Sequence, residues 1–316
     1  MGQVVDSTVF VVVPVYERFA RTQSCIEQLK AQTYPNIEIV IVDGGSRDGS
    51  VDALREIEGI TLIADVGEQW WTGATWYGID YALRHGGETD LVLLLNNDTT
   101  VPHDAVAVLA EEARAHCAAV EAVQVDESDH SKVFCAGATF DWSHYRSVAL
   151  EPPMPSGGFD DRTEVLDGRA TMVPLSILRE VGNVRRRALP HYCADTELFF
   201  RIAHAGYPLA VTHRTWVATA PPPTIPFALG PVTFSQVWRS LWDRRSMSNL
   251  RAHLTVIMLA GPKRGRWRVA SHLAMSAVWT LLATCAPLRA VRARSRWLAR
   301  QSSRILSRDR GADTRQ

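Results

Sequence analysis

Three aspartates stand at strand or loop ends, where their carboxylates would be available for chemistry. Asp43 and Asp98 each follow an apolar run, and Asp195 opens a helical pattern. A carboxylate is a hard oxygen ligand for Mg²⁺ or Mn²⁺, and it can also take a proton from a hydroxyl group. A cap or a turn is the alternative interpretation of each residue. Three such acids at one edge of a sheet indicate a shared site.

The most apolar run of the chain, Leu91 to Leu95, is followed at once by Asn96, Asn97 and Asp98. Five consecutive aliphatic residues predict a strand that is buried on both faces of a parallel sheet. In open α/β sheets the ligand site lies beyond the carboxyl ends of the strands. The three polar residues are therefore expected at such a site, and a simple turn is the alternative.

The surrounding sequence alternates between strand and helix patterns, as a sheet that positions these residues requires. Strands are predicted over residues 8–13, 37–42, 60–64, 90–95, 120–125 and 209–217, and helices over 19–29, 50–57, 76–85, 102–116, 175–181 and 195–205. This order predicts an α/β fold with a parallel sheet and helices on both faces. No G-x-G-x-x-G pattern follows the first strand, which weakens a dehydrogenase interpretation, and no P-loop occurs.

The rhythm changes after residue 126. Residues 126–132 form a polar turn between two strands and predict a hairpin. Residues 151–161 are rich in Pro, Gly and acid and predict a mobile loop, and Gly168 to Pro174 is expected to be a strand that enters a helix. Pro221 to Pro223 marks the predicted boundary between a catalytic domain, residues 1–220, and an extension, residues 221–316.

Composition suits a globular protein, with 316 residues of which 46% are hydrophobic, but the charge is divided unevenly. Residues 1–220 carry a balance of −14, and residues 221–316 carry +14. A basic tail indicates an anionic partner. The five cysteines form no C-x-x-C pair, so no disulfide framework or zinc site is indicated, and a reducing compartment is expected. The first residues show no signal-peptide pattern, which places the body in the cytosol.

Four segments in this order carry a resemblance to a known family. They are Val13 to Arg18, Val42 to Ser46, Leu94 to Asp98 and His191 to Glu197. Together they resemble the family 2 glycosyltransferases of the GT-A fold, over about residues 8–218. The stretch Trp70 to Ala74 is also similar to bacterial members that build surface polysaccharides, including rhamnosyltransferase-like ones. The resemblance implies a Rossmann-like, mixed and mainly parallel sheet with helices on both faces, followed here by a C-terminal helical extension.

The resemblance also implies a donor site at the sheet edge. Roles in binding the nucleotide sugar fall on Pro14, Tyr16, Glu17, Asp43, Gly73, Ala74, Asn96 and Asn97. Among these, Asp43 would accept a hydrogen bond from a uracil- or thymine-type base, and a turn at Gly73 and Ala74 would let the backbone approach the donor. Asp98 would ligate Mn²⁺ or Mg²⁺. The chain departs from the family pattern at Glu17 and at Trp76.

Catalysis and acceptor binding are assigned to a second group of residues. The resemblance makes Asp195 the catalytic base, and the acceptor-binding candidates are Trp70, Trp71, Arg169, His191 and Glu197. His191 and His213 are candidates for a role in binding the metal or the acceptor. An ordinary hydrogen-bonded structural histidine is the alternative for each. The run Arg185 to Arg187 is a hypothetical site for an acceptor phosphate, with a solvated charge run as the alternative.

The basic tail is expected to be helical over residues 235–310. Residues 269–288 are almost free of charge and long enough to span a bilayer, but arginines flank them on both sides. A helix that lies in the membrane interface, or packs on a neighbour, is the preferred interpretation, with the arginines on anionic lipid. Nucleic acid is the weaker alternative, because no binding motif is present.

These observations predict an inverting, metal-dependent transferase. It would move a sugar from a UDP- or dTDP-linked donor to a hydroxyl of a saccharide or lipid-linked saccharide in cell-surface polysaccharide synthesis. The predicted location is the cytosolic face of the cell membrane, held peripherally, and an oligomer is compatible with the sequence. A non-catalytic nucleotide- or membrane-binding subunit and a sugar nucleotidylyltransferase are the alternatives. The latter would need a Gly-rich triphosphate loop, which Pro14 to Glu17 does not provide.

Overall fold

The computed structural model describes residues 7–67, 69–150, 158–220, 233–282 and 284. A nine-stranded sheet has the order β3-β2-β1-β4-β10-β5-β11-β9, with β6 paired to β5. Its strands are β1 (Val9–Val15), β2 (Ile37–Asp43), β3 (Thr61–Ile63), β4 (Leu91–Leu94), β5 (Ala119–Asp126), β6 (Asp129–Cys135), β9 (Phe159–Asp160), β10 (Thr171–Pro174) and β11 (Leu209–Thr219). A separate hairpin consists of β7 (Ala138–Asp141) and β8 (Arg146–Ala149).

The sheet is mixed and mainly parallel. β1 is parallel to β2 and β4, β2 is parallel to β3, and β5 is parallel to β11. β10 lies between β4 and β5 and runs antiparallel to both, and β6 and β9 are antiparallel to their neighbours. The predicted α/β class, the mixed sheet and the hairpin after residue 126 are confirmed.

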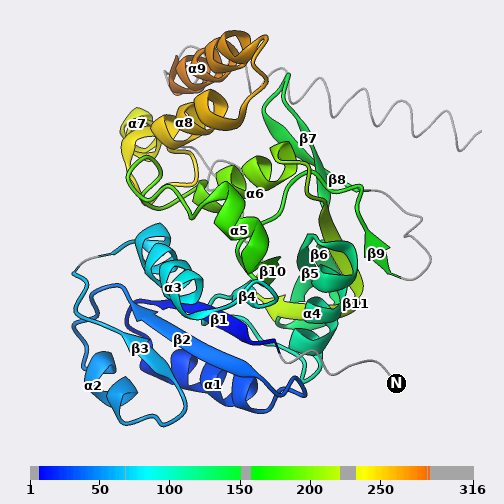
Figure 1. Ribbon diagram of the computed structural model, residues 1–316. Coiled ribbons are helices and arrows are strands. Elements are labelled where there is room, and N and C mark those ends of the chain that lie inside the picture. Colours follow the sequence, from blue (N-terminus) through cyan, green and yellow to red (C-terminus); the bar gives the residue numbers. More distant parts are fainter. Residues whose placement is uncertain (1–6, 68, 151–157, 221–232, 283, 285–316) are drawn as a thin grey trace, which may run out of the picture.

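The alternation of side chains in β1 explains why this strand is apolar throughout. Val9, Val11 and Val13 belong to the core on one face of the sheet, and Phe10 and Val12 belong to the core on the other. The first face is covered by α1 (Phe19–Lys30), α2 (Ser50–Arg55) and α4 (Ala105–His116), and the second by α3 (Trp71–His85), α5 (Leu175–Val181) and α6 (Ala194–His204). Figure 1 shows α1 and α3 on opposite sides of β1.

The described part of the C-terminal extension is helical, as predicted. It comprises α7 (Phe234–Trp242), α8 (Leu250–Ala260) and α9 (Arg266–Leu282). The three helices contact one another, and α8 also contacts α6. Val256 and Ala260 of α8 pack in one cluster with Ala194 and Phe200 of α6. Figure 1 shows the extension at one end of the molecule, beyond α6.

Several predictions fall partly on residues that the structure does not describe. Residues 151–157 of the predicted mobile loop, Pro221 to Pro223 and the end of the apolar segment 269–288 lie outside the described residues. Residues 158–161, the described end of the predicted loop, include the short strand β9. α9 covers the apolar segment as far as Leu282. Among the described residues, no helix combines the length and the hydropathy needed to cross a bilayer. The division at residue 220 stays a prediction.

Candidate active site

The predicted ligand edge is formed by three neighbouring strands. β2, which ends at Asp43, and β4, which ends just before Asn96, lie on either side of β1. Val15, the last residue of β1, is in register with Asp43. On the other side of β1, Val12 accepts a hydrogen bond through its backbone oxygen from the N–H of Leu95 at 3.1 Å. The residues after β1, β2 and β4 therefore meet at one edge of the sheet, where α/β folds bind ligands.

Asp43 is buried and organises the turn that follows β2. Its Oδ2 accepts hydrogen bonds from the backbone N–H groups of Gly45 at 2.8 Å and Ser46 at 3.0 Å, and its Oδ1 accepts one from the Ser46 hydroxyl. The Ser46 Oγ in turn accepts the N–H of Glu17 at 2.6 Å. Asp43 thereby connects the loops after β1 and β2. Its contact with a nucleotide base stays a prediction.

The start of α3 differs from the expectation. The helix begins at Trp71 rather than near Trp76, so the predicted turn at Gly73 and Ala74 is wrong: both residues are buried in the first part of the helix. A Cβ atom on Gly73 would collide with the side chain of Gln69. The Gln69 side chain packs closely against this glycine, and the donor role of Gly73 and Ala74 stays a prediction.

Gln69 joins the start of α3 to the turn at Asp43. The backbone N–H of Gln69 donates to the backbone oxygen of Gly44 at 3.0 Å. A Cβ atom on Gly44 would lie 2.6 Å from the backbone oxygen of Gln69. Trp70, the N-cap of α3, supplies no side-chain cap. The N-terminus of a helix carries partial positive charge and unpaired N–H groups. The positive end of α3 therefore lies at the sheet edge, in a setting that suits an anion.

Trp71 connects the end of β4 with the start of α6. Its indole Nε1 donates a hydrogen bond to Oδ1 of Asn96 at 2.9 Å. The indole also covers Gly168, since a Cβ atom there would lie 2.6 Å from Cζ2 of Trp71 and 3.8 Å from Cβ of Asp195. One side chain thus links the candidate donor residue Asn96 with the surroundings of the candidate base Asp195.

Trp70 points to a different set of partners, which includes a residue that the sequence did not reveal. Its ring lies 5.3 Å from the ring of His191, and the guanidinium of Arg245 lies 5.1 Å from the Trp70 ring. Arg245 comes from the loop between α7 and α8. Burial, and the charge of Arg245, lower the pKa of His191, whose Nδ1 has no hydrogen-bond partner among the described residues. A neutral His191 at neutral pH follows.

Asp195 lies in the first turn of α6, and its Oδ1 accepts the N–H of Thr196 at 2.8 Å. Burial raises the pKa of Asp195, and the negative charge of Asp167 raises it further. A carboxylate with a raised pKa holds a proton more strongly, which is what a general base requires. The structure therefore gives the predicted base a suitable environment.

Asp167 belongs to a buried acidic group that the sequence did not reveal. The Asp167 Oδ2 accepts Nε2 of Gln124 at 3.0 Å, and the Asp167 N–H donates to Oε1 of Glu121 at 3.0 Å. Burial, followed by the charge of Asp167, raises the pKa of Glu121 well above its ordinary value. Asp167 therefore lies between two acids, and its charge raises the pKa of both Glu121 and Asp195.

Asp98 is partly exposed, and no hydrogen bond or ion pair within the described residues engages its carboxylate. The described part of the chain holds no group of three or more His, Cys, Asp or Glu that could bind a metal by itself. Mg²⁺ is commonly held by one or two carboxylates together with substrate phosphates, so Asp98 fits a metal that a diphosphate completes. Asn97 instead contacts α1, where its Nδ2 donates to Oγ1 of Thr22 at 2.9 Å.

Glu197 is buried in an ion-pair network instead of facing an open site. Its Oε2 lies 2.9 Å from Nη2 of Arg201, and its Oε1 lies 3.1 Å from Nε of Arg185. Arg201 also donates to the backbone oxygens of Gly182 and Asn183. These contacts fix the loop after α5, so the geometry gives Glu197 a structural task and offers no free oxygen to an acceptor.

The arginine run after α5 is divided among different partners, which weakens the hypothesis of one phosphate site. Arg185 pairs with Glu197, and the guanidinium of Arg186 lies 3.8 Å from the centre of the Trp76 ring. Arg187 is exposed and forms no ion pair with the described residues. Arg187 alone remains available for an anion.

The other predicted residues take varied positions. Pro14 lies within β1, and Tyr16, which follows this strand, is exposed. The side chain of Arg169 is half-buried, and its N–H donates to Oδ1 of Asp167 at 2.8 Å. His213 sits at an irregularity of β11, where its N–H donates to Gly158 next to β9. The charged groups near His213 are Asp160 of β9 and Arg162, which follows this strand.

Comparison with known proteins adds a family match. A family model described as glycosyl transferase family 2 matches residues 10–163. The chain is 32% identical over 114 residues to an undecaprenyl-phosphate 4-deoxy-4-formamido-L-arabinose transferase of Aeromonas hydrophila, with 33% of each protein covered. It is 42% identical over 52 residues to the glycosyltransferase GlyA of Streptococcus pneumoniae, covering 16% of this chain and 8% of GlyA. The chain thus spans a third or less of these relatives.

Solved structures share the fold at low sequence identity. The mannosyltransferase PcManGT of Pyrobaculum calidifontis, solved with GDP-Man and Mn²⁺, has a TM-score of 0.58 and 20% identity, covering 92% of this chain and 80% of its own. GalNAc-T7, solved with UDP, GalNAc and Mn²⁺, has a TM-score of 0.57 and 14% identity, covering 84% and 54%. These likenesses confirm the GT-A type of fold.

Proposed function

Residues 10–163 belong to glycosyl transferase family 2, and from this premise we propose that the protein transfers a sugar from a nucleotide-diphosphate sugar to a hydroxyl group of an acceptor. The observation that carries the proposal is the link through Trp71. It joins Asn96, at the edge where a donor would bind, to the surroundings of Asp195, a carboxylate with a raised pKa. This link supports a single site that contains both the donor and the base.

The donor would lie at the ends of β1, β2 and β4. Asp43 shapes this edge, and the N-terminus of α3 supplies partial positive charge to a diphosphate. Asp98 would hold Mn²⁺ or Mg²⁺ together with the diphosphate, and the bound cation would neutralise the charge that develops on the leaving group. A UDP- or dTDP-linked donor is proposed. The two solved neighbours contain UDP in one case and GDP-Man in the other.

Asp195 would act as the general base. In the proposed step it takes the proton of the acceptor hydroxyl while that oxygen forms a bond to the sugar C1. The bond between C1 and the diphosphate oxygen breaks, and the nucleoside diphosphate leaves with the electron pair. A single base opposite the leaving group produces inversion at C1, by analogy with glycoside hydrolysis.

The acceptor would enter between Trp70, Trp71, His191 and Arg169. Aromatic rings offer flat apolar faces to sugars, and Arg245 adds a positive charge beside Trp70. A saccharide or lipid-linked saccharide of cell-surface polysaccharide synthesis, used at the cytosolic membrane face, is the proposed acceptor. The Aeromonas relative, whose printed name includes undecaprenyl phosphate, supports a lipid-linked acceptor.

Release of nucleoside diphosphate tests the proposal. The protein would be incubated with Mn²⁺ and with UDP-, dTDP- or GDP-linked sugars, in the presence and absence of a bacterial lipid extract as acceptor. Release that requires the lipid extract, together with sugar recovered in the lipid fraction, is expected. Tight nucleotide-sugar binding without turnover on any acceptor would instead support a non-catalytic subunit.

A further inference from the structure

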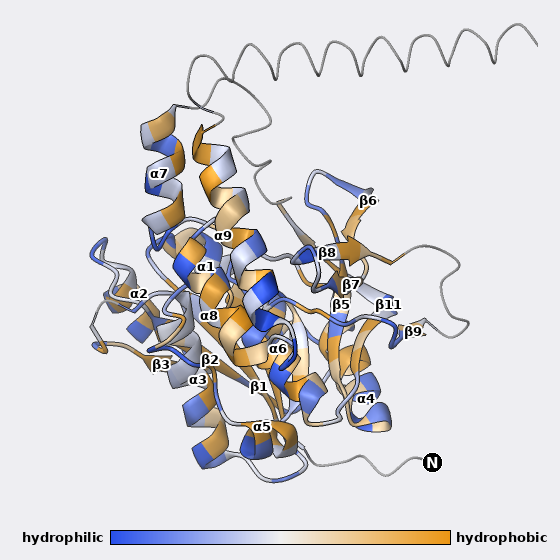
Figure 2. Ribbon diagram, turned by 90° about the horizontal axis from the view of Figure 1, so that it is seen from above, coloured by the Kyte–Doolittle hydropathy of each residue, from blue (hydrophilic) through white to orange (hydrophobic). Residues whose placement is uncertain are grey.

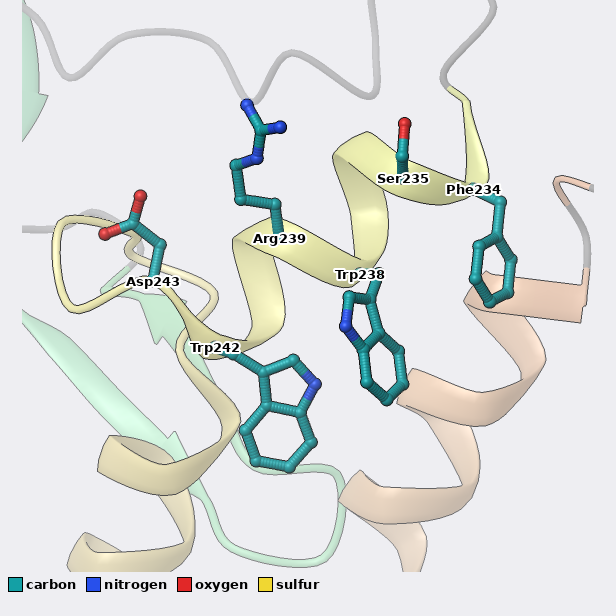
Figure 3. Close-up of a pocket in the computed structure, with 6 residues that line it drawn as sticks. All are labelled: Phe234, Ser235, Trp238, Arg239, Trp242 and Asp243. Carbon is teal, nitrogen blue, oxygen red and sulfur yellow. The ribbon is translucent and has the colours of Figure 1, made fainter.

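α7 carries three large aromatic side chains, Phe234, Trp238 and Trp242, spaced four residues apart, which we call the aromatic row. Their exposed fractions are 50%, 51% and 52%, whereas Val237 and Leu241 on the adjacent face are buried. Figure 3 shows the three rings on the same side of α7, with α9 beside it. A row of half-exposed aromatic side chains on a stable helix marks a surface that binds something.

α7 is a well-defined helix, so the row is a fixed feature. Its first residue is preceded by Thr233, which forms a capping box: the Thr233 hydroxyl accepts the N–H of Gln236, and the Gln236 side chain accepts the N–H of Thr233 at 2.8 Å. An open hollow of about 550 Å³ runs along the row, lined by Phe234, Ser235, Trp238, Arg239, Trp242 and Asp243.

The extension is strongly basic where it is described. Residues 233–282 contain eight Lys or Arg and a single acid, Asp243, which gives a net charge of +7. Arg239 borders the row, and Arg244 comes after Asp243, the C-cap residue of α7. α9 adds a second exposed apolar group, with Trp267 70% and Trp279 60% exposed.

We infer that the aromatic row docks α7 flat onto an anionic lipid surface. Tryptophan side chains favour the boundary between head groups and acyl chains, and arginines reach from there to lipid phosphates. A second copy of the chain would bury the aromatic rings but would bring together two basic segments, residues 233–282 of each copy, with a net charge of +7 each. The sequence predicts contact with an anionic membrane through residues 235–310, and docking through the aromatic row centres this contact on α7.

Docking through α7 would hold the candidate site near the lipid. Arg245, in the loop that follows α7, lies over Trp70 at the start of α3. This consequence rests on the proposed function, because it makes a lipid-linked acceptor the natural substrate of the site. The docking surface itself rests on the exposed rings and the charge alone.

Co-sedimentation of the full chain with vesicles tests the inference. Binding is expected to vesicles of phosphatidylglycerol and phosphatidylcholine and not to vesicles of phosphatidylcholine alone. The double variant Trp238→Ser/Trp242→Ser should lower the binding constant by about ten-fold or more. Arg239→Gln should lower it by about five-fold, the equivalent of about 1 kcal/mol for one basic residue near the surface. Val133→Ser, which removes an exposed apolar side chain from β6, is the matched control and should bind like the wild type.

Two outcomes would overturn the inference. One is a wild-type chain that binds neither kind of vesicle, or binds both equally. The other is a dimer, seen by sedimentation velocity, that the double variant dissociates while vesicle binding is unchanged. An unaltered unfolding midpoint shows that a variant is folded. Stabilisation by nucleotides, measured without vesicles, tests the proposed function independently of lipid docking. Loss of vesicle binding with intact nucleotide binding would refute only the docking, and loss of nucleotide binding with intact vesicle binding would refute only the proposed function.

Discussion

The indole nitrogen of Trp71 donates a hydrogen bond to Oδ1 of Asn96 at 2.9 Å, while the same ring covers Gly168 beside Asp195. This contact joins three segments that are far apart in the chain: the end of β4, the start of α3 and the start of α6. The Trp71 side chain therefore contacts both the candidate donor edge and the surroundings of the candidate base. The predictions below follow from this arrangement.

Gly168→Ala should disturb the site through Trp71. The added methyl group would lie 2.6 Å from Cζ2 and 2.7 Å from Cη2 of the indole. Overpacking of this kind costs about 1–3 kcal/mol, and here it would displace the ring that binds Asn96. Urea unfolding and the rate of sugar transfer should both decline. Gly87→Ala, where the new Cβ would make only an ordinary contact, is the control and should leave both unchanged.

Asp195→Asn should abolish transfer and leave the fold intact. A general base contributes about 10²–10⁴-fold to a rate, and asparagine cannot accept the proton. Because the pKa of Asp195 is raised in the folded state, its ionised form destabilises the fold at neutral pH. The variant should therefore unfold at the same or a higher denaturant concentration than the wild type. Full activity of the variant would remove Asp195 from the mechanism.

Asp167→Asn should shift the pH dependence of transfer. Burial is the main cause of the raised pKa of Asp195, and the charge of Asp167 adds to it. Removing that charge lowers the pKa of Asp195, so the base becomes ionised at lower pH. The acidic limb of the kcat/KM profile should move to lower pH. The asparagine keeps a single amide oxygen, which can accept from either Gln124 or the N–H of Arg169. A limb that stays in place or moves to higher pH contradicts the assignment.

Arg201→Ala should destabilise the fold. It would leave the buried Glu197 with Arg185 as its only ion-pair partner among the described residues. Breaking a buried pair costs about 3 kcal/mol or more, which unfolding in urea can measure. Arg187→Ala, at an exposed position of the same loop, should change stability little. A stable Arg201→Ala variant that loses only acceptor affinity would restore the acceptor role predicted for Glu197.

Much of the fold could be predicted because apolar runs mark buried strands. The run at Leu91 to Leu95 located β4 and the edge that follows it, and Asp195 was recognised at the start of a helix. Glu121 could not be recognised, because a buried acid within an apolar strand becomes visible only when Asp167 is placed beside it. The turn predicted at Gly73 was wrong because a glycine inside a helix has the same sequence signal as one in a turn.

Arg245 illustrates a further limit. The sequence shows it as one of many arginines in a basic tail, and only the packing of α8 on α6 brings its loop to Trp70. Likewise, the spacing of Phe234, Trp238 and Trp242 fits a buried helix face as well as an exposed one. Burial of Val237 and Leu241 decides which face α7 turns to solvent.

Thermal unfolding with nucleotides tests the central claim most directly. The protein would be heated with UDP, dTDP, GDP or CDP, each with and without Mn²⁺, and a ligand at about 100 times its Kd should stabilise it by about 2.7 kcal/mol. Stabilisation by UDP or dTDP that requires Mn²⁺, disappears in Asp98→Ala and persists in the surface control Glu127→Ala is the predicted result. No stabilisation by any nucleotide, or stabilisation unaffected by Asp98→Ala, would contradict a metal-assisted nucleotide-sugar site at this edge.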